Sequence, residues 1–263
     1  MLEKKNILGV DVTAADRKTV LEHVIKFLKN DKKDSKVFIV TPNPEILVYA
    51  NSHPDYKKIL NGAQISLVDG VGLLVGAKIL GKGPLDRFTG VDFIENLCLE
   101  CKDQPISMGF LGGRTGVAEK AAECLQAKYP WIKVAFVAEE WGESANGKWQ
   151  MANSSVVRPS AISHTPYASI DILFVAFGAP RQEEWIAQHL EKLPVRAAMG
   201  VGGSFDYISG EVRRAPVWIR NIGLEWLFRL ILQPWRWRRQ LALVEFGWLV
   251  MRARLGLYQS DNV

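Results

Sequence analysis

Short continuous apolar runs alternate with longer stretches in which apolar residues recur at helical spacing. Val37–Thr41 and Ile106–Leu111 lack the polar alternation of half-exposed strands, which is typical of strands buried on both faces. Val20–Leu28 carries apolar residues three or four positions apart, which indicates a helix with one buried face. Buried strands joined by helices predict a parallel sheet that helices cover on both faces.

The same alternation continues through most of the chain and predicts an α/β doubly wound, Rossmann-like body. The predicted strands are Ile7–Val12, Val37–Thr41, Gln64–Val68, Ile106–Leu111, Ile132–Ala138, Asp171–Phe177 and Val195–Val201. The predicted helices are the one around Val20–Leu28, which Thr13 is placed to cap, and Glu45–Asn51, Pro54–Gly62, Val71–Leu80, Gly90–Lys102, Thr115–Lys128 and Pro180–Glu191. The polar stretch Gly142–Ser169 predicts a loop with one weak helix.

The chain changes character near Val212. From there on every basic residue is an arginine, and tryptophan is frequent: Arg213, Arg214, Arg220, Arg229, Arg236, Arg238, Arg239, Arg252, Arg254, Trp218, Trp226, Trp235, Trp237 and Trp248. Pro234 separates two helical segments of this region. We therefore predict two domains, an α/β domain at residues 1–211 and an Arg/Trp-rich helical appendage at residues 212–263.

The appendage has two interpretations. Arginine pairs with phosphates and tryptophan prefers the interface between water and lipid, so helices rich in both suit an anionic membrane surface. We favour this for Trp235–Arg239, and we expect the apolar residues Ile222, Leu224, Leu227 and Leu230 to pack on the body. A nucleic acid would explain the same composition. The candidate arginines for a lipid diphosphate or a membrane are Arg213, Arg214, Arg220, Arg236, Arg238 and Arg239.

The overall composition is that of an ordinary globular protein with a modest excess of positive charge. Of 263 residues 48% are hydrophobic and 23% charged, and the net charge of +5 favours an anionic partner. No run of about 18 apolar residues and no apolar leader occurs, so we expect a cytoplasmic protein that meets a membrane only from its surface. Cys98, Cys101 and Cys124 lack zinc spacing, which predicts reduced thiols.

Polar residues follow several predicted strands, at the carboxyl ends where open parallel sheets bind their ligands. Asp69 lies between a buried strand and a glycine-rich helix start, which suits a general base, with a helix N-cap as the alternative. Arg87 lies in a loop and suits a phosphate or a carboxylate, with a surface ion pair as the alternative. Thr41 and Asn43 lie in a proline-stiffened loop that capping by Asn43 explains on its own.

Glycine turns follow three other predicted strands and suit a nucleotide diphosphate. They contain Gly112, Gly113, Gly178, Gly202 and Gly203. The turn at Gly178 leads into a helix whose open N-terminus is a natural anion site. None of the turns has the spacing of a dinucleotide fingerprint or of a P-loop, which weakens the hypotheses of an oxidoreductase, a kinase or an ATPase.

The sequence contains no D-x-D triplet, the motif with which many nucleotide-sugar enzymes hold a divalent cation. A diphosphate leaving group would then depend on arginines, backbone amides and helix N-termini. We expect no metal and no other cofactor.

Taken together and in order, these motifs resemble the WecG/TagA/CpsF glycosyltransferases over nearly the whole chain. The matching segments are Thr41-Pro42-Asn43-Pro44-Glu45, Val68-Asp69-Gly70-Val71-Gly72, Asp86-Arg87-Phe88-Thr89-Gly90, Phe110-Leu111-Gly112-Gly113, Phe177-Gly178-Ala179-Pro180-Arg181-Gln182-Glu183, Gly202-Gly203-Ser204-Phe205-Asp206, Arg213-Arg214-Ala215-Pro216-Val217-Trp218 and Gly223-Leu224-Glu225-Trp226. The stretch Gly142–Ser169 fits the family pattern least well.

The resemblance implies an inverting, metal-independent transferase that works on the inner leaflet of the cytoplasmic membrane. Members of the family add N-acetylmannosamine, from its UDP form, to undecaprenyl-diphosphate-linked N-acetylglucosamine for wall teichoic acid, and others use related sugars for common antigen, capsule or exopolysaccharide. We therefore expect a UDP-sugar donor and a lipid-diphosphate sugar acceptor as partners. UDP-glucose and UDP-uronic acids remain alternative donors, and the oligomeric state remains open.

The resemblance also implies residue roles. Asp69 would be the general base, Arg87 would steady the diphosphate, and Gln182 would contact the donor. Thr41 and Asn43 would line the sugar pocket, and the C-terminal appendage would close over the site and touch the membrane. A nucleic-acid-binding protein would explain the basic appendage but not the turn at Asp69, so we expect no nucleic-acid partner.

Overall fold

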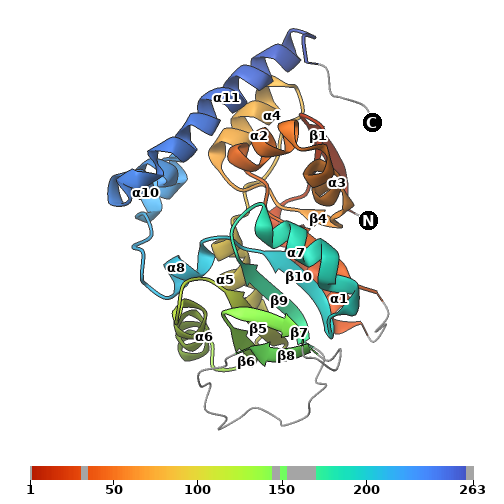
Figure 1. The fold of residues 1–263 in the computed structure, drawn as a ribbon, viewed down its shortest axis with the longest axis vertical. Helices are drawn as coiled ribbons and strands as arrows, with labels where there is room; N and C mark the ends of the chain where they lie inside the picture. The colour runs from red at the N-terminus through yellow and green to blue at the C-terminus, as the bar shows by residue number, and fades with distance from the viewer. Residues whose placement is uncertain (1, 31–34, 144–148, 153–169, 259–263) are drawn as a thin grey trace. The chain divides into compact units, whose positions relative to one another are not determined.

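The chain forms two compact units, which are built from alternating segments of the sequence. The computed structural model describes residues 2–30, 35–143, 149–152 and 170–258 (Figure 1). Unit 1 comprises Met1–Val20, Val40–Thr89 and Arg213–Val263, and unit 2 comprises Leu21–Ile39 and Gly90–Val212. The residues from Arg213 onward thus group with two N-terminal segments. The independent domains predicted at residues 1–211 and 212–263 stay a prediction.

A mostly parallel sheet forms the centre of the α/β fold. Its strand order is β4–β3–β10–β9–β5–β6, and the described pairings of β3, β10, β9, β5 and β6 are all parallel. The strands are β3 (Val37–Val40), β4 (Ile65–Ser66), β5 (Ser107–Gly112), β6 (Lys133–Ala138), β9 (Ile170–Ala176) and β10 (Val195–Gly200). The predicted α/β fold with a parallel sheet is confirmed, because the continuous apolar runs are indeed buried strands.

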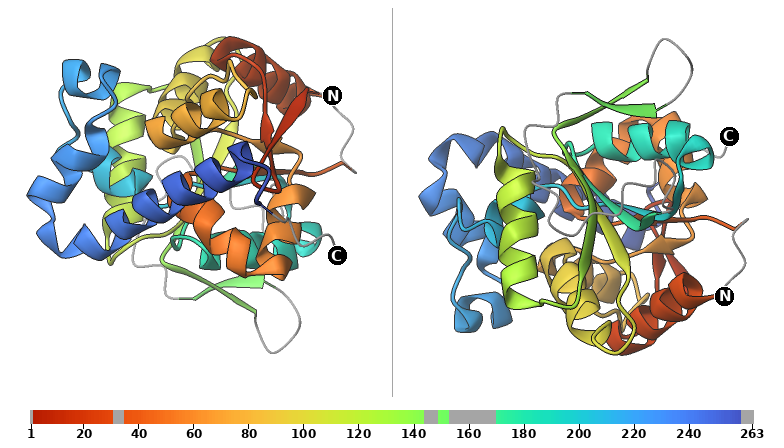
Figure 2. Two further views of the ribbon diagram at one scale, coloured as in Figure 1. Left: turned by 90° about the horizontal axis from the view of Figure 1, so that it is seen from above. Right: turned by 90° about the horizontal axis from the view of Figure 1, so that it is seen from below.

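Helices cover both faces of this sheet in unit 2. The helices are the main part of α1 (Arg17–Lys29), α5 (Gly90–Glu100), α6 (Val117–Lys128), α7 (Arg181–His189) with the short η1 (Leu190–Lys192), and α8 (Ser204–Ile208). The crossover β5–α6–β6 runs along the sheet in the opposite direction to β9–α7–β10. Right-handed crossovers that run in opposite directions place their helices on opposite faces, as Figure 2 shows for α6 and α7.

The N-terminal region of unit 1 is an antiparallel hairpin, where a single strand over Ile7–Val12 was predicted. β1 (Lys4–Ile7) pairs with β2 (Val10–Thr13), because Leu8 and Gly9 adopt φ values of 51° and 84° and reverse the chain. The predicted capping by Thr13 is also wrong. Thr13 ends β2, and its Oγ1 accepts a hydrogen bond from the Ser66 amide at 3.0 Å. Asp16 instead accepts from the Thr19 amide at the start of α1.

The rest of unit 1 is helical. Its helices are α2 (Pro44–Ser52), α3 (Pro54–Gly62), α4 (Val71–Ile79), α9 (Val217–Asn221), α10 (Glu225–Leu232), η2 (Pro234–Arg236) and α11 (Trp237–Arg254). Figure 1 shows α11 lying along α2 and α4. Glycines let both of these helices approach α4: a Cβ at Gly76 would lie 2.7 Å from the Phe246 ring of α11, and one at Gly72 would lie 2.8 Å from Pro44 of α2.

The polar stretch Gly142–Ser169 lies mostly outside the described residues. Where it is described, it belongs to a small antiparallel hairpin of β7 (Glu140–Glu143) and β8 (Trp149–Ala152). The strand β8 falls where a loop was predicted, and the predicted weak helix is not found in these residues. Among the described residues, no helix is both long and apolar enough to span a membrane.

Candidate active site

Backbone hydrogen bonds place three segments with predicted site residues side by side in unit 1. The Leu67 amide donates to the Val40 carbonyl at 2.8 Å, and the Asp69 amide donates to the Pro42 carbonyl at 2.9 Å. On its other side, Val68 forms a parallel bridge with Arg87. The segments that carry Thr41 and Asn43, Asp69, and Arg87 are therefore neighbours, although up to 46 positions separate Thr41 from Arg87 in the sequence.

Asp69 is half-buried and lies just before the start of α4. The N-cap of this helix is Gly70, which has a φ of 96° and forms no side-chain cap. The alternative interpretation of Asp69 as the N-cap residue is therefore wrong. The role of Asp69 must be one other than capping α4.

Asn43 does cap a helix. Its Oδ1 accepts a hydrogen bond from the Ile46 amide at 3.0 Å in the first turn of α2, as the structural interpretation of this loop predicted. The side chain of Asn43 is half-buried, and that of Thr41, two positions earlier in the sequence, is buried. Capping holds the Asn43 side chain in a fixed orientation, with its NH₂ group on the side opposite the bond to Ile46.

Arg87 is part of a charged cluster that also includes residues of the C-terminal region. Glu225 of α10 lies with Oε2 3.9 Å from Arg87 Nη2 and accepts a hydrogen bond at 3.1 Å from Arg214 Nε. The side chains of Arg87 and Glu225 are only 13% and 17% exposed. Arg214 also donates to Thr89 Oγ1 at 3.4 Å. Two guanidinium groups thus share one carboxylate.

Sequence reasoning missed Glu225 as a member of the site. One feature of the sequence could have identified it: Glu225 and Glu245 are the only acidic residues between Val212 and Gln259, a region rich in arginine. A lone acid among arginines indicates a specific partner, but only the tertiary structure shows that the partners are Arg87 and Arg214.

The other predicted arginines of the appendage have different surroundings. Arg239 forms a two-pronged ion pair with Glu45 of α2, with both distances 2.7 Å. Arg238 lies over the Trp237 ring, with 5.6 Å from Cζ to the ring centroid. Arg213 is exposed, and Arg220 and Arg236 are half-buried. Arg214, as described above, belongs to the Arg87 cluster.

In unit 2, the glycine turns lie where the sheet reverses its connection order. The crossovers that leave β5 and β9 run in opposite directions, so the carboxyl ends of these two adjacent strands form the topological switch point. Gly112 pairs with Ala176 in the sheet, and the Gly113 amide donates to the Ala176 carbonyl at 3.1 Å. Both glycines have φ values near 90°, and a Cβ at Gly112 would lie 2.7 Å from the Phe177 ring. Only glycine fits this turn.

The turns at Gly178 and Gly202 are joined by one side chain. The Oε1 of Gln182 accepts hydrogen bonds from the Gly178 amide at 3.2 Å and from the Gly202 amide at 2.9 Å. Gly203 follows in the same turn and is the N-cap of α8. The structure therefore brings the predicted glycine turns together at the carboxyl ends of β5, β9 and β10, and it places Gln182 beneath two of them.

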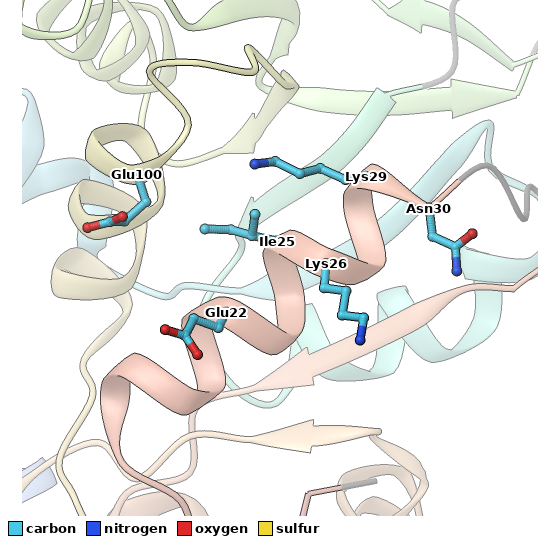
Figure 3. A pocket seen from close by; sticks show the side chains of 6 residues that line it. All are labelled: Glu22, Ile25, Lys26, Lys29, Asn30 and Glu100. Atoms are coloured by element: carbon cyan, nitrogen blue, oxygen red, sulfur yellow. The ribbon is translucent and has the colours of Figure 1, made fainter.

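A shallow pocket on unit 2 lies elsewhere. Its lining is shown in Figure 3 and consists of Glu22, Ile25, Lys26, Lys29, Asn30 and Glu100. These residues come from the middle and end of α1 and from the end of α5, and the two helices lead into the amino ends of β3 and β5. Because parallel sheets bind ligands at the carboxyl ends, this pocket is not part of the candidate site. Within the described ranges, no group of three or more His, Cys, Asp or Glu side chains is arranged to hold a metal ion.

The model of the glycosyl transferase WecG/TagA/CpsF family matches residues 5–260, a range that contains every one of these candidate residues. The chain belongs to this family. It is therefore a glycosyltransferase, and the resemblance inferred from the motifs is confirmed. The WecG/TagA/CpsF match covers both units, so the family pattern includes the Asp69 and Arg87 segments of unit 1 and the glycine turns of unit 2.

Named bacterial relatives agree with the family. The chain is 30% identical over 251 residues, 95% of its length, to an N-acetylglucosaminyldiphosphoundecaprenol N-acetyl-beta-D-mannosaminyltransferase of Bacillus spizizenii, of which 92% is covered. It is 30% identical over 234 residues to the Bacillus subtilis protein of the same name, with 88% and 86% of the two chains covered. The Staphylococcus aureus protein of that name is 30% identical over 252 residues, with 95% and 93% covered.

Proposed function

We propose that this glycosyltransferase moves N-acetylmannosamine, or a related sugar, from its UDP form to undecaprenyl-diphosphate-linked N-acetylglucosamine in the synthesis of a cell-surface polysaccharide. The relatives named above carry this acceptor and this sugar in their names. The structural observation that carries the proposal is the set of backbone hydrogen bonds that join the Thr41–Asn43, Asp69 and Arg87 segments.

Asp69 is the proposed general base. It takes the proton from a hydroxyl of the acceptor sugar while the oxygen of that hydroxyl forms a bond to the anomeric carbon of the donor. The bond from the anomeric carbon to the diphosphate breaks, and UDP leaves with the electron pair. Attack from the face opposite the leaving group inverts the anomeric centre. The half-buried position of Asp69, outside the α4 cap, supports this role.

Arg87 and Arg214 are the proposed partners of diphosphate groups. Glu225 lies against both guanidinium groups and holds them in place. Guanidinium groups that are already positioned stabilise developing phosphate charge without the reorganisation that free side chains require. Because the sequence has no D-x-D triplet, arginines and backbone amides take the place of a divalent cation at the diphosphate. Metal independence is therefore part of what the experiment must test.

The glycine turns of unit 2 are the proposed site for the UDP part of the donor. Gly112 and Gly113 lie at the topological switch point, and the turns at Gly178 and Gly202 lie at the ends of the next two strands. Glycine backbones allow close approach of phosphates, and exposed amides at helix starts favour negative charge.

A donor screen tests the proposal as a whole. The purified protein is incubated with a short-chain lipid-diphosphate N-acetylglucosamine and a panel of UDP-sugars in the presence of EDTA, and UDP release and product mass are followed. We expect product with UDP-N-acetylmannosamine. Product with UDP-glucose or a UDP-uronic acid instead would keep the reaction class and change the donor. No product with any donor, together with no binding of UDP, would refute the proposal.

Asp69→Asn is the sharpest single test of the mechanism. Loss of the proton acceptor should lower kcat by at least about a hundredfold, because general-base catalysis contributes that much or more. UDP affinity, measured by calorimetry, should stay close to the wild-type value. Asp55→Asn is the matched control, because the Asp55 side chain is 97% exposed on α3, where it pairs with Lys58. A wild-type rate for Asp69→Asn would remove Asp69 from the reaction.

We also propose that the C-terminal region of unit 1 lies on the inner leaflet of the membrane. One face of α11 packs on α2 and α4 through Phe246 and Val250. The opposite face carries a stripe of large apolar residues, each more than half exposed: Trp237, Leu241, Val244, Trp248, Met251 and Leu255. Arg238 and Arg252 lie over the Trp237 and Trp248 rings. Arginine stacked on exposed tryptophan suits a surface of anionic lipid.

Vesicle binding tests this surface. We expect the protein to sediment with vesicles of phosphatidylglycerol and phosphatidylcholine more than with phosphatidylcholine alone, because each basic residue near an anionic surface adds about 1 kcal/mol. The double variant Val244→Glu, Trp248→Glu should lower binding roughly tenfold or more, since its carboxylates would have to enter the lipid interface. Leu99→Glu is the control, because Leu99 on α5 is also more than half exposed but lies outside the stripe on α11. A change in sedimentation velocity of the free protein, with unaltered vesicle binding, would instead identify the stripe as a subunit interface.

A further inference from the structure

The start of α7 contains a buried polar pair that the proposed reaction steps leave unexplained. Gln182 and Glu183 are 2% and 0% exposed, although both occupy the first turn of the helix. Burying a carboxamide and a carboxyl group costs free energy unless their hydrogen-bonding groups are satisfied. Gln182 Nε2 donates to Glu183 Oε1 at 2.6 Å, which satisfies one group on each side chain.

Three neighbours determine the orientation of the Gln182 carboxamide. The amides of Gly178 and Gly202 both donate, so the group that faces them must be the carboxamide oxygen. The carboxyl oxygen of Glu183 accepts, so the group that faces it must be the carboxamide NH₂. A carboxamide turned by 180° would lose all three hydrogen bonds.

Gly200 is shaped to receive this carboxamide. A Cβ at Gly200 would lie 2.9 Å from Gln182 Nε2 and 3.1 Å from its Cδ, so a side chain there would push the carboxamide out of its position. Gly200 ends β10, and the turn that contains Gly202 follows directly. The side chain of Gln182 is therefore packed against the end of β10. Its carboxamide oxygen holds the turn at Gly178, which follows β9, and the turn at Gly202, which follows β10.

We propose that Glu183 is a positioning residue for the nucleotide part of the donor. By holding the carboxamide of Gln182 in one orientation, Glu183 keeps the Gly178 and Gly202 turns in the relative positions that a nucleoside diphosphate requires. Gln182 then acts on the donor through the two turns rather than by contact. This inference rests on the proposed function, because it takes UDP as the ligand of these turns.

Four variants separate this role from general stabilisation. Glu183→Met keeps the volume and removes the acceptor, and Gln182→Met removes the clamp itself. Glu183→Gln retains an oxygen that accepts from Gln182 and should rescue the function. Glu184→Met is the matched control on the same turn, since Glu184 is half-buried and its backbone amide bonds to Pro180. Near-UV circular dichroism identifies any variant that does not fold; if Glu183→Met fails, Gln182→Met and Glu183→Gln decide the outcome.

The first measurement needs no ligand. Hydrogen exchange of the Gly178 and Gly202 amides is followed by NMR in the free protein. We expect exchange at least about tenfold faster in Glu183→Met and Gln182→Met, because one lost net hydrogen bond corresponds to roughly that factor. Exchange should be unchanged in Glu183→Gln and Glu184→Met. Equal protection of both amides in wild type and Glu183→Met would overturn the proposal.

The second measurement uses UDP and the full reaction. UDP affinity should fall about tenfold in Glu183→Met. The KM for the donor should rise by a similar factor, while kcat and the KM for the acceptor should change little. A fall in kcat with unchanged donor KM would contradict a positioning role. If wild-type protein binds no UDP, the proposed donor is wrong, whereas the amide exchange still tests whether Glu183 orients Gln182.

Discussion

At the scale of single residues, burial decides the chemistry of side chains that look equivalent in the sequence. Cys98 and Cys101 are both fully buried, and Cys124 is exposed. Burial raises the pKa of the Cys98 thiol to about 12 and that of the Cys101 thiol to about 11, because a thiolate loses its hydration in the interior. Cys98 and Cys101 are therefore protonated core residues at neutral pH.

Thiol labelling checks this assignment. At pH 8 the folded protein should react rapidly with iodoacetamide at Cys124 alone, because pH 8 lies well below the raised pKa values of Cys98 and Cys101. Cys124→Ser should abolish rapid labelling, and denaturant should release the other thiols. Mass spectrometry counts the labels. Rapid labelling of Cys98 in the native protein would contradict its burial.

At the scale of elements, glycines determine which helices approach each other. The sequence of α4 is rich in glycine, and from the sequence these glycines were interpreted only as part of the turn at Asp69. The structure shows a second reason, since Gly72 and Gly76 admit Pro44 of α2 and Phe246 of α11. Gly76 thus lets the C-terminal helix α11 approach α4, and Gly72 lets α2 approach it.

A pair of glycine substitutions tests this packing. Gly76→Ala should lower the free energy of unfolding by about 1–3 kcal/mol, because its Cβ would overlap the Phe246 ring. Gly247→Ala on α11 should raise it by about 0.5–1 kcal/mol, because nothing lies within 4 Å of that Cβ and alanine favours helix. Urea unfolding measures both. Equal effects of the two substitutions would mean that α11 does not pack on α4 in solution.

At the scale of the whole molecule, the chain passes repeatedly between the two compact units. Unit 1 is built from three segments, and its last segment is joined to the others only through residues 90–212 of unit 2. If unit 2 unfolded alone, this connection would become a long flexible loop. Closing such a loop has an entropic cost that grows with the logarithm of its length, so each unit stabilises the other through chain connectivity.

Calorimetry tests this coupling. We expect a single thermal transition in which the calorimetric and van't Hoff enthalpies agree. When unit 2 unfolds, its residues become a flexible loop between segments of unit 1, and the entropic cost of closing that loop destabilises unit 1. The Gly76→Ala protein, destabilised within unit 1, should shift the whole transition to lower temperature. Two resolved transitions, of which only one moves in Gly76→Ala, would show that the units unfold independently.

Several features were predictable from the sequence because they depend on local pattern. Continuous apolar runs identified the buried strands β3, β5, β9 and β10, whose burial on both faces leaves no polar alternation. Strand ends with Asp69, Arg87 and glycine turns identified the candidate residues, because a parallel sheet collects its carboxyl ends at one edge. The order of these motifs identified the family.

Other features needed the tertiary structure, because they join residues far apart in the chain. No local pattern shows that Glu225 lies against Arg87 and Arg214, or that Gln182 joins the turns at Gly178 and Gly202. The hairpin of β1 and β2 escaped prediction because Leu8 takes a positive φ that its residue type does not indicate. The sequence by itself therefore determined the sheet, the family and the candidate residues. Long-range packing decided which of those residues hold one another in place, since such contacts depend on how distant segments meet.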